Sequence, residues 1–162
     1  MNEKKASKNK ITIPHLLLAC RHVQEMLDAG ITYNFAIRTL EHWADWYSNH
    51  YKSTRGKFQV YSVRNIDLWS KAALRDKKKH PKKRPLEYLR VEHGTPRRAF
   101  AGMVLKLFKS KRLNENSVNR LADRYWQLAV ITLEEDRRLN KMARSKAYPS
   151  PAKRWAAAGI MF

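Results

Sequence analysis

The chain has few cysteine, glycine and proline residues, and it has no long apolar run. Cys20 is the single cysteine among 162 residues, which excludes an intramolecular disulfide and a zinc site built from cysteine pairs. Five Gly and six Pro exclude collagen-like and low-complexity architectures. No run approaches the ~18 apolar residues of a membrane span. A reducing, cytoplasmic compartment is therefore expected.

Acidic residues are scarce relative to basic ones. The sequence holds 34 Lys and Arg against 14 Asp and Glu, a formal net charge of +20. Self-repulsion at this level destabilises a folded chain, and a polyanionic partner relieves it. The composition therefore favours DNA or RNA as partner, alone or within a nucleoprotein complex. A secreted cationic protein or a membrane-surface binder is the alternative explanation of the charge.

The apolar residues are numerous enough for a core and follow a helical period. They make up 43% of the chain, and aromatic residues make up 10%. We expect a mainly α fold, a compact bundle of six or seven helices, with at most a short β element near residues 58–63 and 86–91. Residues 1–10 are expected to form a flexible basic arm, and residues 11–162 a single helical domain with a basic loop at 75–85.

Local signals mark where several helices begin and end. Gly30 is expected to end the first helix, and a short link to the next predicts an antiparallel helical hairpin. Asn65 or Asp67 is a candidate cap for a helix that runs into the basic loop. A later helical pattern extends through Leu128 and Ala129, and Ser150 is expected to cap the final helix.

The basic loop is the first candidate site. Its cations could span several phosphates, and two prolines stiffen it. The residues predicted to contact nucleic acid here are Arg75, Lys77, Lys78, Lys79, Lys82, Lys83 and Arg84. A solvated charge run is the alternative interpretation. Arg75 and His80 also have the Arg-x4-His spacing used by helical ribonucleases of the HEPN class, a spacing that a Lys-rich run can produce by chance.

The second candidate site is the corner at residues 90–98. Glu92 and His93 lie just before a predicted helix N-terminus, where backbone amides favour anions. Arg97 and Arg98 lie in the first turn, where cations oppose the helix dipole, and both are predicted to contact phosphate. Glu92, His93 and Arg97 are therefore candidate catalytic residues, with Glu92 or His93 as general base or metal ligand. A turn with a buried, hydrogen-bonded histidine is the alternative.

Three consecutive acids at 134–136 form the third candidate site. In so basic a chain they suggest a metal site, with Glu134 and Asp136 as candidate ligands. Helix rules explain the same residues without a metal. Glu135 completes a capping box with Thr132, and Glu134 can pair with Arg138 one turn later.

Several aromatic residues could stack on nucleobases. The helical spacing of Trp43, Trp46, Tyr47 and Tyr51 favours core packing for most of these four residues. Trp46 lies on the opposite helical face from its neighbours. Tyr33, Tyr51 and Tyr61 are the better candidates for exposed stacking.

Five strings resemble those of a group of short bacterial proteins of unassigned function. They are ITYNFAIRTL, DLWSKAAL, RVEHGTPRRAF, YWQLAVITLEEDRRLN and RWAAAGI, at residues 31–40, 67–74, 90–100, 125–140 and 154–160. The group is associated with phage and plasmid contexts. The resemblance implies a mobile-element or defence setting, and it implies no activity and no site residues.

Three function classes follow. The first is a helical module that binds DNA or RNA through phosphates, without a cofactor. The second is a nuclease or toxin-like ribonuclease acting at the Glu92, His93 and Arg97 corner, for which a divalent metal would be the cofactor. The third is an interaction protein that docks on an acidic protein. No membrane partner is expected.

Overall fold

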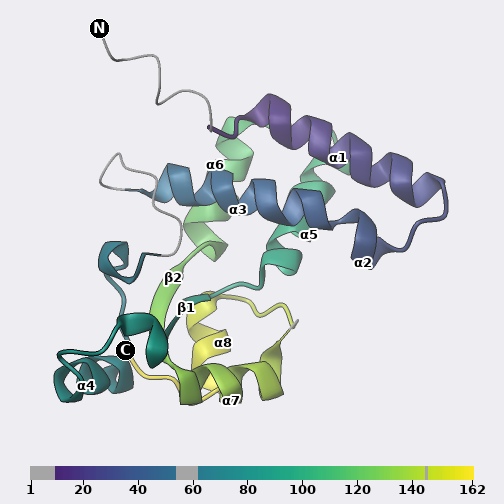
Figure 1. Cartoon of the computed structure of the whole chain (residues 1–162). Helices are drawn as coiled ribbons and strands as arrows, with labels where there is room; N and C mark the ends of the chain where they lie inside the picture. Colours follow the sequence, from purple (N-terminus) through teal and green to yellow (C-terminus); the bar gives the residue numbers. More distant parts are fainter. Residues whose placement is uncertain (1–9, 54–61, 145) are drawn as a thin grey trace, which may run out of the picture. The chain divides into compact units, whose positions relative to one another are not determined.

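A computed structural model describes residues 10–53, 62–144 and 146–162 of the chain (Figure 1). The fold is mainly helical with one small two-stranded antiparallel sheet, which confirms the predicted fold class. Contacts divide the chain into a helical unit, residues 1–58 and 100–123, and a sheet unit, residues 59–99 and 124–162. No described helix combines the length and apolar character needed to cross a bilayer. The arm predicted at residues 1–10 lies outside the described residues except for Lys10.

The helical unit is built on a hairpin of α1 (Ile13–Asp28) with α3 (Arg38–Lys52). The backbone N–H of Thr12 donates to Nδ1 of His15 at 3.1 Å, and this contact fixes the start of α1. Gly30 has φ +79°, a left-handed conformation that favours glycine and ends the helix as predicted. Figure 1 shows α1 and α3 running side by side in opposite directions, which confirms the predicted hairpin.

The remaining helices of this unit close its core. The short α2 (Tyr33–Ala36) precedes α3, and the buried Ile37 separates the two helices. Most of α5 (Arg97–Lys109) and α6 (Glu115–Tyr125) belongs to this unit. The hydroxyl of Tyr47 on α3 donates to Asn119 on α6 at 2.8 Å. The core includes Leu16, Cys20, Val23, Ile37, Leu40, Phe100, Val104 and Val118.

The sheet unit is organised by β1 (Leu89–His93) and β2 (Leu128–Thr132). The strands pair antiparallel, with Leu89 opposite Thr132 and His93 opposite Leu128. On the other edge of β2, Ser70 donates its backbone N–H to the carbonyl of Val130 at 2.9 Å. The N–H of Val130 donates to the carbonyl of Leu68 at 2.8 Å. Strand β2 is therefore hydrogen-bonded along both edges.

The prediction that helical structure extends through Leu128 and Ala129 is wrong, since α6 ends at Tyr125 and β2 follows. Residues 129–132 are all buried, and three of the four are β-branched. Such residues suit a strand buried on both faces. The predicted β element near 86–91 corresponds to β1, preceded by the 3₁₀ turn η2 (Pro85–Glu87). Residues up to 61 of the other predicted element lie outside the described residues, and Val63 starts the 3₁₀ turn η1 (Val63–Asn65).

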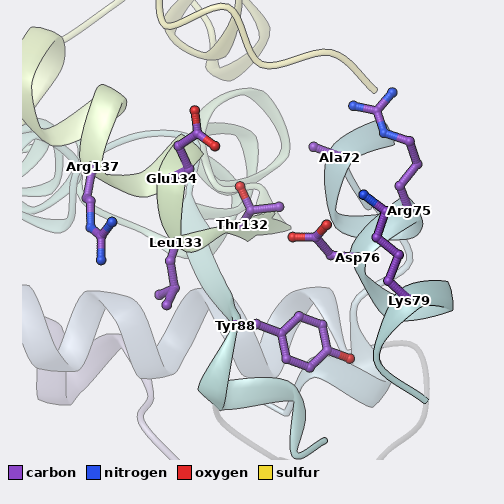
Figure 2. Close-up of a pocket in the computed structure, with 9 residues that line it drawn as sticks. All are labelled: Ala72, Arg75, Asp76, Lys79, Tyr88, Thr132, Leu133, Glu134 and Arg137. Atoms are coloured by element: carbon purple, nitrogen blue, oxygen red, sulfur yellow. The ribbon is translucent and has the colours of Figure 1, made fainter.

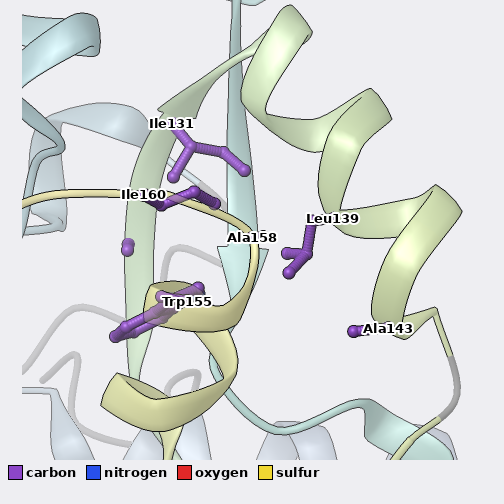
Figure 3. Close-up of a cluster of buried hydrophobic side chains, with 7 residues drawn as sticks. Ile131, Leu139, Ala143, Trp155, Ala158 and Ile160 are labelled. Atoms are coloured by element: carbon purple, nitrogen blue, oxygen red, sulfur yellow. The ribbon is translucent and has the colours of Figure 1, made fainter.

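Two helices pack on the sheet unit's main core. They are α7 (Leu133–Ala143) and α8 (Pro151–Ala157), which begins at its predicted cap, Ser150. Trp155 of α8 lies among side chains of β2, α7 and the C-terminal segment (Figure 3). The cluster comprises Ala129, Ile131, Leu139, Ala143, Trp155, Ala158 and Ile160.

A third α-helix of the sheet unit is α4 (Lys71–Lys79), which precedes α7 and α8 in the sequence. Its cap is Ser70, whose Oγ accepts from the N–H of Ala73 at 3.0 Å, and the prediction of Asn65 or Asp67 as cap is wrong. Since the helix continues to Lys79, the basic loop predicted at 75–85 is helical over its first half. Lysines in a last helical turn are favourable because they face the negative end of the helix dipole. The prediction that residues 11–162 form one domain stays a prediction.

Candidate nucleic-acid interface

The basic segment 71–84 is the most strongly charged stretch of the sheet unit. It carries eight Lys and Arg against one Asp, on α4 and on the turn that follows. The predicted contact residues Arg75, Lys77, Lys78, Lys79, Lys82, Lys83 and Arg84 are all exposed. The whole sheet unit holds 20 Lys and Arg against 7 Asp and Glu, a net charge of +13. The segment therefore presents a dense positive surface.

Within the described part of the chain, no carboxylate pairs with the cations of this segment. Among the described residues, none of the Lys and Arg side chains between positions 71 and 84 forms an ion pair. Lys77 instead places its ammonium 4.7 Å from the ring centre of Trp69, a cation–π contact that leaves its charge uncompensated. The positive charge of the segment is consequently available to an external anion.

A hollow of about 370 Å³ lies beside this segment, between α4 and the start of α7 (Figure 2). Its lining comes from α4, from the residue before β1 and from the β2–α7 junction. The lining residues are Ala72, Arg75, Asp76, Lys79, Tyr88, Thr132, Leu133, Glu134 and Arg137.

Two helices supply the charged groups of the hollow. Arg75 and Lys79 are one turn apart on α4, and Arg137 reaches it from α7. Figure 2 shows the α4 pair on one side and Arg137 on the other, with the ring of Tyr88 between the two helices. Tyr88 is half-buried, and His80 packs edge-on against it at 5.4 Å between ring centres. Arg75 and His80 thus contribute to one surface, where His80 supports an aromatic ring.

The Glu92 corner is built around a buried ion pair. Arg154 of α8 donates to a carboxylate oxygen of Glu92 at 2.6 Å, and 3% and 17% of the two side chains are exposed. The same guanidinium donates to the carbonyls of His93 at 2.8 Å and Ala143 at 3.3 Å. Burial raises the pKa of Glu92, and the hydrogen bond and charge of Arg154 oppose this shift without cancelling it. This geometry gives Glu92 a role in holding α8 against β1.

The other residues of this corner are closely packed. The ring of His93 meets the buried Trp126 edge-on at 5.0 Å between ring centres. A Cβ on Gly94 would lie 2.3 Å from Cβ of Pro151, so this position admits only glycine without a shift of α8. Arg97 and Arg98 are half-buried in the first turn of α5. The candidate catalytic groups are therefore embedded in contacts within the protein.

The acids at 134–136 follow the helix rules. The N–H of Glu135 donates to Oγ1 of Thr132 at 3.1 Å, and the N–H of Thr132 donates to the Glu135 carboxylate at 2.9 Å, which confirms the capping box. Glu134 pairs with Arg138 at 3.3 Å, and Asp136 accepts from Asn140 at 3.0 Å. Over residues 10–53, 62–144 and 146–162 no group of three or more metal-ligating side chains comes together.

The exposed aromatic residues agree in part with the prediction. Trp46, Tyr33 and Tyr51 have 37%, 41% and 40% of their surface exposed, and the hydroxyl of Tyr51 donates to Asp123 at 3.0 Å. Tyr61 lies outside the described residues. The sequence interpretation missed Tyr88 and Arg137, because their neighbours in the hollow are far away along the chain.

Comparisons with known protein families, with curated proteins and with solved structures give no significant match to this chain. The likeness to short phage- and plasmid-associated proteins therefore stays a prediction, as does a cytoplasmic location.

Proposed function

We propose that this protein binds DNA or RNA through the phosphate backbone, by means of the basic surface of the sheet unit. The observation that carries the proposal is the segment 71–84, whose exposed cations are without carboxylate partners among the described residues. Folding leaves their mutual repulsion in place, and phosphates would relieve it while releasing condensed counterions. Contacts of this kind position a protein on nucleic acid without reading the sequence.

The dependence of binding on salt tests this proposal. The variant to compare with the unaltered chain is Lys78→Gln/Lys82→Gln/Lys83→Gln, which removes three exposed lysines that do not line the hollow. Each lost phosphate contact lowers the slope of log K against log salt by about 0.7 to 0.9. We therefore expect the slope to fall by roughly 2 for a labelled 20-mer.

The matched control removes the same charge from the helical unit, as Lys106→Gln/Lys109→Gln/Lys111→Gln. Lys106 and Lys109 lie in the last turn of α5, Lys111 follows the helix, and all three are exposed. The control is expected to change the slope by well under 1. Equal slopes for the two triple variants would mean that net charge, and no particular surface, drives binding. If the unaltered chain binds neither polymer at low salt, an acidic protein becomes the better candidate partner.

The nuclease alternative is tested with the same material. Binding and cleavage are measured with and without Mg²⁺ for the unaltered chain and for Glu92→Gln/His93→Ala. Because Glu92 is held by Arg154, we expect salt-dependent binding without cleavage. Cleavage that disappears in the double variant would instead identify the corner as a catalytic site.

A further inference from the structure

The side chains that line the hollow beside α4 include more groups than contact with a phosphate requires. Arg75 and Lys79 bring two positive charges from α4 to one side of the hollow, and Arg137 of α7 lines its opposite side (Figure 2). Arginines and lysines in such a cluster suit a phosphate group, which accepts hydrogen bonds from each of them. A protein can contact the phosphate backbone of a nucleic acid with a flat surface and needs no cavity for it. The lining residues of the hollow other than its cations therefore indicate which further part of the ligand the hollow would bind.

Tyr88 gives the hollow an aromatic surface among charged groups. The backbone of Tyr88 is anchored to the start of α7, because its carbonyl accepts from the N–H of Leu133 at 3.2 Å. His80 supports the ring edge-on at 5.4 Å between ring centres. A positioned aromatic ring next to cations is the arrangement in which single-stranded nucleic acids stack their bases, whatever the base.

Two carboxylates share the same cavity. Asp76 and Glu134 both line it, and they would repel a bare phosphate. The charge of Glu134 is partly offset by Arg138, at 3.3 Å. Asp76 points from α4 toward the side of Thr132 (Figure 2). A carboxylate suits a ligand that also carries donors, such as the hydroxyls of a sugar or the exocyclic amine of a base.

The size of the hollow limits the ligand to one unit. A volume of about 370 Å³ is at the small end of the range for small-molecule sites. Bases of an intact duplex are stacked on both faces and paired, so they cannot turn a face toward a protein ring. Only an unpaired nucleotide can place its base in this cavity while its phosphate lies against the cations.

We propose that the hollow receives one unpaired nucleoside monophosphate unit of the bound strand, with its phosphate at Arg75 and Lys79 and its base against Tyr88. The proposal rests on nucleic-acid binding by the sheet unit. It adds that the protein distinguishes single strands and unpaired ends from continuous duplex.

The test compares the affinities of variants for a single-stranded 20-mer and for a blunt duplex of the same sequence at one salt concentration. Tyr88→Leu removes the ring and keeps an apolar side chain, and we expect about a tenfold loss on the single strand. The duplex affinity should change by less than about twofold. Tyr88→Phe keeps the ring and should bind like the unaltered chain.

A second pair of variants does not depend on the folding of the Tyr88 variants. Arg75→Gln and Arg84→Gln each remove one exposed cation from the same basic segment, but only Arg75 lines the hollow. On the single strand, Arg75→Gln should lose several times more affinity than Arg84→Gln. On the duplex, the two losses should be equal.

Several results would overturn the proposal. Equal losses of Tyr88→Leu on both polymers, or no loss on either, would show that the hollow does not select an unpaired nucleotide. Binding of 5′-AMP that Tyr88→Leu abolishes, without any preference for single strands, would assign the hollow to a free nucleotide. In both cases salt-dependent polymer binding would persist, whereas the absence of any polymer binding would contradict the proposed function itself.

Discussion

The guanidinium of Arg154 and the carboxylate of Glu92, 62 positions apart in the sequence, meet at 2.6 Å in a largely buried ion pair. The pair joins α8 to β1, and the carbonyls of His93 and Ala143 use further donors of the same guanidinium. Burial of two charges gains little over apolar packing, but the loss of one partner leaves the other charge buried alone. Because Arg154 also donates to two carbonyls, the corner should respond more strongly to its loss than to a change of Glu92 that keeps an acceptor.

Replacement of the arginine is expected to be the more damaging change. Arg154→Met leaves the Glu92 carboxylate and two carbonyls without their donor, so the free energy of unfolding should fall by about 3–5 kcal/mol. Glu92→Gln removes the charge that faces the buried guanidinium but keeps an oxygen that accepts from it, so the free energy of unfolding should fall by a smaller amount, about 1–2 kcal/mol. Urea denaturation at pH 7, followed by circular dichroism, measures both. Equal losses would show that the charge of Glu92, and not its hydrogen bond, stabilises the corner.

The stability of this corner should also depend on pH. The folded-state pKa of Glu92 is raised above its ordinary value of 4.5, because burial outweighs the pairing with Arg154. The folded state therefore binds the proton more tightly than the unfolded state. The stabilising contribution of the protonated group is complete below the unfolded pKa and is lost as pH rises through the folded pKa.

The variant Glu92→Gln isolates this contribution from the other carboxylates. Between pH 4 and pH 7, the stability of the unaltered chain should fall relative to that of the variant. The measurement is the difference between their free energies of unfolding at each pH. A difference that moves in the opposite direction would mean that Arg154 lowers the pKa of Glu92 by more than burial raises it.

The features that the sequence predicted depend on neighbours within about one helical turn. The capping box of Thr132 and Glu135, the end of α1 at Gly30 and the pairing of Glu134 with Arg138 are all of this kind. Each requires only the local backbone and one nearby side chain, so residue type and spacing are sufficient evidence.

The features that the sequence did not predict depend on distant partners. Strand β2 is a strand because β1 and residues 68–70 bond to its two edges, and its spacing alone also fits a helix. The sequence around Glu92 on β1 does not reveal its partner Arg154, which lies on α8, and Glu92 was therefore a candidate base. The hollow combines α4 with Tyr88 and Arg137, which are separated from it by the basic turn and by β2. Tertiary contacts therefore decide both the strand and the site.

Glu135 is expected to stabilise the sheet unit far more than its neighbour Glu134. It is 3% exposed, and its carboxylate accepts from Ser70 Oγ at 2.6 Å and from the N–H of Thr132 at 2.9 Å. Glu135→Ala leaves both buried donors without an acceptor, so the free energy of unfolding should fall by about 2–4 kcal/mol. Glu134→Ala, the matched control, removes only an exposed pair with Arg138 and should lower it by less than about 0.5 kcal/mol. Similar losses for the two variants would contradict the assignment of Glu135 as the buried connection between α4 and α7.

Cys20 is expected to resist thiol reagents as long as the helical unit is folded. The side chain is fully buried, and burial raises the pKa of its thiol to about 12. At pH 8 only about one thiol in ten thousand would be ionised, and the thiolate is the reactive form. Labelling with a disulfide reagent should therefore proceed at the rate at which the unit opens, and it should accelerate in denaturing urea.

A chain that carries Ser110→Cys supplies the control for this measurement. Ser110 is exposed at the end of α5 in the same unit, so its replacement should react within the mixing time while Cys20 stays unmodified. Mass spectrometry of the labelled chain distinguishes one modification from two. Rapid modification of Cys20 in the unaltered chain without denaturant would mean that α1 separates readily from α3, because Cys20 lies on the buried face of α1.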